Sequence, residues 1–197
     1  MEQPDQVFLR DLERKTTVYA SHLATDALGF GGFRDAFVSD DGRFVAFNDR
    51  VAGFGLEHNV GFLTDLVEPR AAALLDLSKR VRGPDAVNVR WLSPDGSTAI
   101  VSSAMPGLDP EAPHNARMGF YRYDRASGRF RRLTPSALDL TCGEDYPFFA
   151  VSGDGQTIAL ATANPTLVPK DLNGDLDVFT VSLVDGSVEL ISVAAQP

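Results

Sequence analysis

A repeated arrangement of short β-prone segments constrains the fold of this chain more than any other feature of its sequence. Glycines that follow an aspartate in a short turn occur at Gly42, Gly96 and Gly155, at intervals of 54 and 59 residues. Aromatic residues that open a second kind of segment pair recur at intervals of 54, 58 and 59 residues: Phe8, Phe62, Phe120 and Phe179. Two independent markers with the same period indicate internal repetition of a structural unit.

The last copy of the repeat, at residues 150–193, is the most complete. Two apolar runs flank a Gly-Asp-Gly turn at Asp154, and two further runs flank a Val-Asp-Gly turn at Asp185. Short β-rich runs around a Gly/Asp pair predict β-hairpins with tight turns. The polar segment 164–177 between the two hairpins contains two prolines, which favours a loop over a helix. The predicted unit is therefore four antiparallel strands whose connections are short, long and short.

Repetition of four-stranded antiparallel sheets around an axis is the β-propeller. We therefore predict an all-β chain, a single propeller over residues 1–197, with a half-blade and three blades: 6–20, 33–75, 86–133 and 146–193. Within the first blade, the segment 48–59 is expected to be a loop. The segment Arg70–Leu77, RAAALLDL, could also form a helix, but its position in the repeat favours a strand.

The predicted number of blades, about three and a half, is too small for a closed ring. Propellers usually need about four or more blades to close, and an open ring leaves strand edges that can pair with another chain. We therefore expect the chain to be a part of a longer protein or to cover these edges by self-association.

Three phrases, VSDDGRFVAF, LSPDGSTAIV and VSGDGQTIAL, resemble the SPDG-type repeat of TolB-like, WD-repeat-like bacterial β-propellers. The loop LVPKDLNGDLDVF is similar to a recurrent loop of secreted or surface members, and the resemblance covers nearly the whole chain. It implies either a periplasmic interaction module or the gating domain of a prolyl-oligopeptidase-type hydrolase. The chain differs from the family in its missing signal peptide and its small number of blades. The resemblance implies a periplasmic or secreted location for a fragment, and Met1 as the true start would imply a cytoplasmic one.

Composition and charge exclude several classes of partner. The net charge is -9, with 18 Lys and Arg against 27 Asp and Glu, whereas nucleic-acid binding needs clustered cations. No apolar run approaches the length that spans a membrane, so we expect no membrane insertion. The single cysteine, Cys142, excludes an internal disulfide and a site with several cysteines. A protein partner or self-association is the expectation that remains.

The order of short and long connections locates a candidate binding face. In a four-stranded meander the turns within hairpins lie at one end and the links between hairpins lie at the other, so the long polar links gather on one face. The candidate ligand or partner residues there are Asp35, Glu57, His58, Asn59, Asp85, His114, Asn115, Arg117 and Asp145. The three aspartates hold equivalent repeat positions, so they could instead bond the loop backbone or pair with a neighbouring blade.

The segment 171–177 alternates acidic and amide side chains, which suits a hard cation such as calcium. The candidate ligands are Asp171, Asn173, Asp175 and Asp177. The spacing is not that of an EF-hand, because Gly174 occupies the fourth position and Ser182 the twelfth. A metal-free turn capped by its own side chains is the alternative, in which case the chain needs no cofactor.

Enzyme signatures are absent from the sequence. The chain contains no G-x-S-x-G elbow, phosphate-binding loop, H-E-x-x-H or paired-cysteine motif. We therefore expect a non-enzymatic TolB-like binding module that recognises a protein or other ligand through its long-loop face. The alternatives are the propeller of a larger hydrolase and a calcium-stabilised surface protein.

Overall fold

The computed structural model describes residues 6–22, 34–53, 56–67, 74–76, 87–112, 118–134, 148–163, 167–168 and 175–192. A two-stranded sheet, here called the half-blade, pairs β1 (Phe8–Arg10) with β2 (Thr17–Tyr19). Three four-stranded sheets follow. Blade 1 comprises β3 (Arg34–Val38), β4 (Phe44–Gly53), β5 (Leu56–Asp65) and β6 (Leu74–Asp76). Blade 2 comprises β7 (Asn88–Leu92), β8 (Thr98–Ser103), β9 (Gly119–Asp124) and β10 (Arg129–Arg132). Blade 3 comprises β11 (Phe148–Val151), β12 (Thr157–Thr162), β13 (Asp177–Ser182) and β14 (Val188–Leu190).

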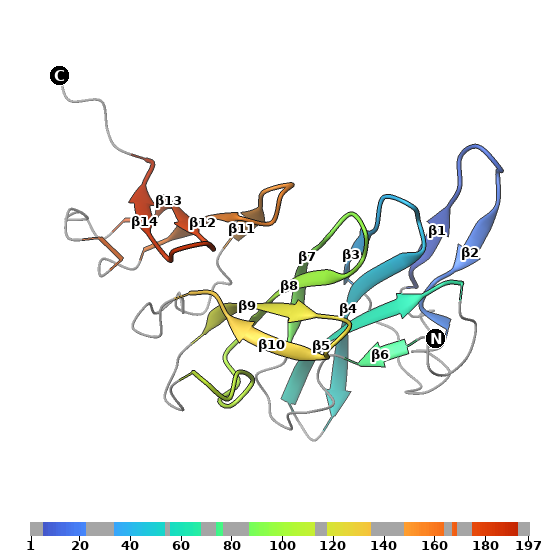
Figure 1. Cartoon of the computed structure of the whole chain (residues 1–197), viewed down its shortest axis with the longest axis horizontal. Helices are drawn as coiled ribbons and strands as arrows, with labels where there is room; N and C mark the ends of the chain where they lie inside the picture. Colours follow the sequence, from blue (N-terminus) through green and yellow to red (C-terminus); the bar gives the residue numbers. More distant parts are fainter. Residues whose placement is uncertain are drawn as a thin grey trace.

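Each blade is an antiparallel meander in which strands adjacent in the sequence are adjacent in the sheet. Figure 1 shows the sheets following one another across the molecule in chain order, from the half-blade to blade 3. This arrangement confirms the predicted fold class, an all-β partial propeller of four-stranded blades. The segment Leu74–Asp76 is a strand, as its repeat position predicts, and the rest of Arg70–Leu77 lies outside the described residues.

The turns between the first two strands of the blades use one side-chain device three times. In blade 2 the Ser93 hydroxyl donates to Asp95 Oδ1 at 2.6 Å, and the same oxygen accepts the Ser97 N–H at 3.0 Å. The Ser93 Oγ in turn accepts the Thr98 N–H at 2.9 Å. Equivalent bonds join Ser39 to Asp41 and Ser152 to Asp154. Because Asp and Ser side chains replace backbone partners in such turns, each Asp-Gly turn is held closed by its own residues.

These hydrogen bonds predict a dependence of stability on pH. They hold the pKa of Asp95 at about 2, below its ordinary value of 3.8, with the Ser93 hydroxyl as the largest cause. A carboxyl with a lowered folded pKa contributes stability above the unfolded pKa and loses it as pH falls through the folded pKa. We expect the urea midpoint to fall between about pH 4 and about pH 2, and to fall less in Asp95→Asn.

The matched control for this prediction is Asp40→Asn. The Asp40 carboxylate lies in the equivalent turn of blade 1 but makes no side-chain hydrogen bond with a described residue. It should therefore keep the acid-limb slope of the unchanged protein. Equal slopes for Asp95→Asn and the unchanged protein would contradict the assignment.

The core consists of three apolar clusters, one between each pair of neighbouring sheets. The half-blade and blade 1 enclose Ala20, Phe47 and Phe62, and blades 1 and 2 enclose a larger cluster around Val89 and Tyr121. Blades 2 and 3 enclose the third cluster: Ile100, Phe120, Ile158, Leu160, Leu167, Phe179, Val181 and Leu183. Burial of apolar surface between neighbouring sheets provides most of the free energy that holds the blades together.

The periodic phenylalanines share one structural position but not one environment. Phe62, Phe120 and Phe179 lie in the third strands of the three blades and are 0–2% exposed. Phe8 lies at the corresponding position of the half-blade and is 55% exposed. In the described part of the chain, β1 pairs only with β2. The half-blade therefore leaves uncovered an aromatic side chain that complete blades bury.

Candidate functional site

The long links lie at one end of the blades, as the order of turns predicts. Residues 104–118 join β8 to β9, residues 133–147 join β10 to β11, and residues 163–176 join β12 to β13. We call this end the long-link face. The opposite end carries the Asp-Gly turns described above. The arrangement follows from the meander alone, because successive connections alternate between the two ends of a sheet.

The predicted loop at 48–59 is wrong. Strands β4 and β5 continue as a paired ribbon up to Gly53 and Leu56. Glu57, His58 and Asn59 are therefore backbone members of β5, opposite Ala52, Val51 and Arg50. Pairing of the two strands satisfies the backbone groups that a loop would leave to solvent, which outweighs the local preference of Gly and Asn for turns. The three residues still belong to the end of β5 nearest the long-link face.

Of the other predicted face residues, only Asp35 lies among the described residues. Asp85, His114, Asn115, Arg117 and Asp145 lie outside them, and their place on the face stays a prediction. In the sequence, Asp85 precedes the start of β7 at Asn88 by three residues, and Asp145 precedes the start of β11 at Phe148 by three. Two of the candidate calcium ligands, Asp171 and Asn173, also lie outside the described part.

Asp35 occupies a strained bulge near the start of β3. The pairing of β3 with β4 shifts register between Arg34 and Ala36, which leaves Asp35 as the extra residue. Its φ is +45°, a backbone region in which Asp is among the few side chains tolerated. Bulges re-aim a side chain out of the sheet pattern. The Asp35 side chain remains 56% exposed at the long-link end of the innermost strand of blade 1.

Arg90 is the bulge residue of blade 2, one position nearer the turn than Asp35 is in blade 1, and was missed by sequence reasoning. It is the extra residue where β7 shifts register between Val89 and Trp91. Its Nε donates to Ser102 Oγ at 2.9 Å, and its Nη1 lies 3.9 Å from Asp35 Oδ2 of blade 1. The guanidinium also lies 4.2 Å from the ring centroid of Phe149 in blade 3. Arg90 thus connects the innermost strands of all three blades.

The repeat pattern of the sequence does distinguish Arg90 from the residues at the same position of the other blades. Counting back three residues from the turn serine of each blade gives Ala36, Arg90 and Phe149. One cation at a position that is otherwise apolar breaks the repeat pattern. Departures of this kind mark residues that do something other than pack.

Asn48 fixes the relative position of blades 1 and 2. Its Oδ1 accepts the Val89 N–H at 2.7 Å, and its Nδ2 donates to the Val89 carbonyl at 3.0 Å. The amide therefore pairs with β7 as a further strand would. Asn48 Nδ2 also lies 3.4 Å from Asp35 Oδ2. Asn48, Asp35 and Arg90 form one polar group, here called the inner-strand cluster, in which each member contacts a neighbouring blade.

The candidate calcium segment is described only at its end. Asp177 begins β13, is 7% exposed, and accepts the Ser192 hydroxyl at 2.5 Å. Asp175 is exposed. Across the described ranges, no group of three or more His, Cys, Asp or Glu side chains is placed to hold a metal ion. The same part of the chain contains no helix long and apolar enough to cross a membrane.

No family model and no curated protein matches the chain, but solved structures do. It is similar to a prolyl endopeptidase, at 11% identity and a TM-score of 0.50, over 95% of this chain and 25% of that one. It is similar to a puromycin hydrolase mutant complexed with PGG, at 17% identity and a TM-score of 0.51, over 90% and 24%. It also matches the β-propeller domain of the Trilobed protease from Pyrococcus furiosus, at 11% identity and a TM-score of 0.46, over 81% and 41%.

At these identities the matches show the fold alone: the protein is a partial β-propeller. The chain spans about a quarter of the length of the prolyl endopeptidase and puromycin hydrolase chains.

Proposed function

We propose that the chain is a non-enzymatic binding module of TolB-like type, which recognises a protein or another ligand through its long-link face. The observation that carries the proposal is the inner-strand cluster. Arg90 of blade 2 and Asn48 of blade 1 both contact the Asp35 carboxylate, and more than half of the Asp35 side chain remains exposed. A charged group that is fixed and still accessible suits recognition, because little of its freedom remains to be lost on binding.

The charge of the face favours a basic partner. Of the three aspartates predicted for the face, Asp35 is described and lies within β3, and Asp85 and Asp145 stay predictions. An acidic face on a chain of net charge -9 attracts a basic protein segment and repels nucleic acid. The resemblance to TolB-like propellers supports the same role and, with it, a periplasmic or secreted location.

Charge reversal on the face tests this proposal. We expect the double variant Asp85→Lys, Asp145→Lys to lose about tenfold or more in affinity for a captured partner, since a like charge replaces an attractive one. The control is Glu13→Lys, Asp40→Lys, which makes the same charge change at exposed positions of the opposite end. Quantitative pull-down followed by titration of the captured protein measures both. A partner that is lost with the control variant and kept with the face variant would reverse the assignment.

The second candidate function is the propeller domain of a larger hydrolase. The similarity to a prolyl endopeptidase and a puromycin hydrolase, over a quarter of each, favours it. In that case the long-link face would meet a catalytic domain of the same protein. The coding sequence around this chain separates the two candidates, because a hydrolase domain in the same reading frame supports the second and its absence supports the first.

A further inference from the structure

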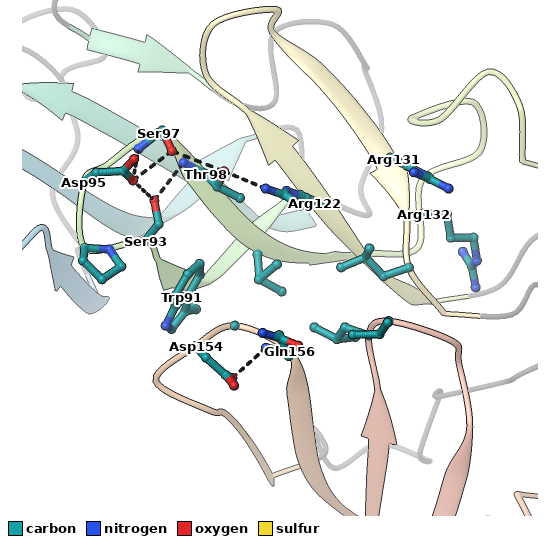
Figure 2. A pocket seen from close by; sticks show the side chains of 16 residues that line it. Trp91, Ser93, Asp95, Ser97, Thr98, Arg122, Arg131, Arg132, Asp154 and Gln156 are labelled. Carbon is teal, nitrogen blue, oxygen red and sulfur yellow. Dashed lines mark hydrogen bonds between the residues drawn. The ribbon is translucent and has the colours of Figure 1, made fainter.

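A cleft of about 760 Å³ separates blade 2 from blade 3. Figure 2 shows its two sides: strands and the Asp95 turn of blade 2 above, and the Asp154 turn of blade 3 below. The cleft begins at the short turns of both blades and extends along β10 as far as Leu133, the first residue of the 133–147 link. Its volume is within the range of about 300–1,000 Å³ that is usual for small-molecule sites.

Two arginines occupy paired positions on neighbouring strands on the blade 2 side of the cleft. Arg122 of β9 is directly opposite Arg131 of β10 in the strand pairing, and both side chains are exposed. Like charges at directly opposed positions destabilise a sheet. Within the described residues the Arg131 side chain makes no ion pair or hydrogen bond. Arg122 makes a long contact of 3.4 Å with Thr98 Oγ1. The pKa of Asp124 is lowered chiefly by the Ser127 hydroxyl and less by the charge of Arg122.

A third arginine, Arg132, also lines the cleft but is engaged within its own blade. Its Nη1 donates to the Tyr121 hydroxyl at 2.7 Å, and its Nε donates to the Thr134 carbonyl at 2.9 Å. It therefore adds positive potential without offering its whole guanidinium to a ligand. The forks of Arg122 and Arg131 carry the capacity for bidentate bonds to an oxyanion.

The rest of the cleft is partly apolar and partly acidic. Trp91, Ile100 and Leu183 also line the cleft; Trp91 is half-buried, whereas Ile100 and Leu183 belong to the buried cluster between the blades. The Asp95 and Asp154 carboxylates lie in the two turns, where each accepts hydrogen bonds from its own turn residues. These carboxylates already accept hydrogen bonds within their turns, whereas Arg122 and Arg131 have no strong partner among the described residues. The cleft is therefore suited to bind an anion.

We propose that this cleft binds a small organic anion whose carboxylate or phosphate is held by Arg122 and Arg131 and whose apolar body packs against Trp91. Neutralisation of the opposed arginines removes their repulsion, and the cleft walls exclude water from one side of the resulting ion pairs. Charge-assisted bonds to a planar guanidinium are about twice as strong as neutral ones.

Trp91 supplies a direct readout because it is the one tryptophan of the chain. We expect phenyl phosphate or benzoate to change Trp91 fluorescence saturably, and calorimetry to give the same dissociation constant. Arg122→Gln together with Arg131→Gln should weaken binding about tenfold or more. The double variant Arg122→Lys, Arg131→Lys keeps the charges but not the planar guanidinium groups. Its affinity for the anion should therefore lie between that of the unchanged protein and that of the double glutamine variant.

The matched control is Arg129→Gln, which removes an exposed arginine of the same strand that does not line the cleft. It should leave the dissociation constant within about twofold, with thermal unfolding used to confirm that every variant folds. Tighter binding of phenyl phosphate or of benzoate identifies the oxyanion as phosphate or carboxylate, and either result supports the site. Equal binding of neutral benzyl alcohol, equal weakening by Arg129→Gln, or no saturable signal by either method would overturn it.

Discussion

Replacement of Gly96 by alanine is expected to destabilise the protein by about 2–5 kcal/mol. Gly96 has a φ of +65°, and a Cβ there would lie 2.5 Å from Phe44 Cγ and 2.8 Å from Phe44 Cβ in the neighbouring blade. The left-handed backbone costs about 1–2 kcal/mol for a non-glycine residue. The collision adds about 1–3 kcal/mol, since Arg125 stacks 4.2 Å from the Phe44 ring centroid and restricts its movement. Urea unfolding measures the loss.

Gly107 provides the control for this prediction. Its φ is +78°, but no atom lies within 4 Å of the Cβ that alanine would add. Gly107→Ala should therefore show only the backbone cost, and the difference between the two variants isolates the collision between blades. Phe44→Ala should make Gly96→Ala less harmful than it is alone. Equal losses for Gly96→Ala and Gly107→Ala would mean that the Phe44 contact does not constrain the turn.

Replacement of Asn48 by alanine is also expected to cost about 2–6 kcal/mol, because it leaves two buried backbone groups without partners. The Val89 N–H and carbonyl both bond to the Asn48 amide, and Val89 is 0% exposed. Each unsatisfied group costs about 1–3 kcal/mol. We expect faster hydrogen exchange at the Val89 amide and a lower urea midpoint, since blades 1 and 2 lose a specific link.

A matched control for this variant is Asn88→Ala on the same strand as Val89. The Asn88 side chain is half-buried and makes no hydrogen bond with a described residue, so its loss should be small. Asn48→Asp tests the geometry further. It keeps an acceptor for the Val89 N–H but places a carboxylate against the Val89 carbonyl, so it should not restore stability. Equal losses at positions 48 and 88 would show that the link between blades is energetically unimportant.

Local patterns were sufficient for most of the fold. The Asp-Gly turns at Gly42, Gly96 and Gly155 predict three hairpins, and each glycine has the positive φ that such a turn requires. Turn and strand preferences act over a few residues, which is why the sequence can be interpreted without knowledge of the rest of the molecule. The segment 48–59 shows the limit of that approach. Its Gly and Asn residues favour a loop, but pairing between β4 and β5 extends the ribbon through them.

Part of the candidate site could also be predicted from the sequence, and part of it could not. The end of the blades that carries the long links follows from the order of short and long connections, and Asp35 could be assigned to it from the repeat. The partners of Asp35 could not, because Arg90 and Asn48 reach it from other strands, and the departure of Arg90 from the repeat pattern does not say which residue it meets. The opposed pair Arg122 and Arg131 required the register of β9 and β10.

The sequence by itself therefore determined the repeating unit, its strands and turns, the all-β propeller class and the face that gathers the long links. These features depend on hydrophobic pattern, turn chemistry and period, all of which are local or repeated. Only the tertiary structure decided which side chains of different blades meet: Asn48 with Val89, Arg90 with Asp35 and Phe149, and Gly96 with Phe44. The physical reason is that contacts between blades depend on strand register, bulges and the way the sheets stack, and residues 41 or more positions apart in the chain carry no mark of one another.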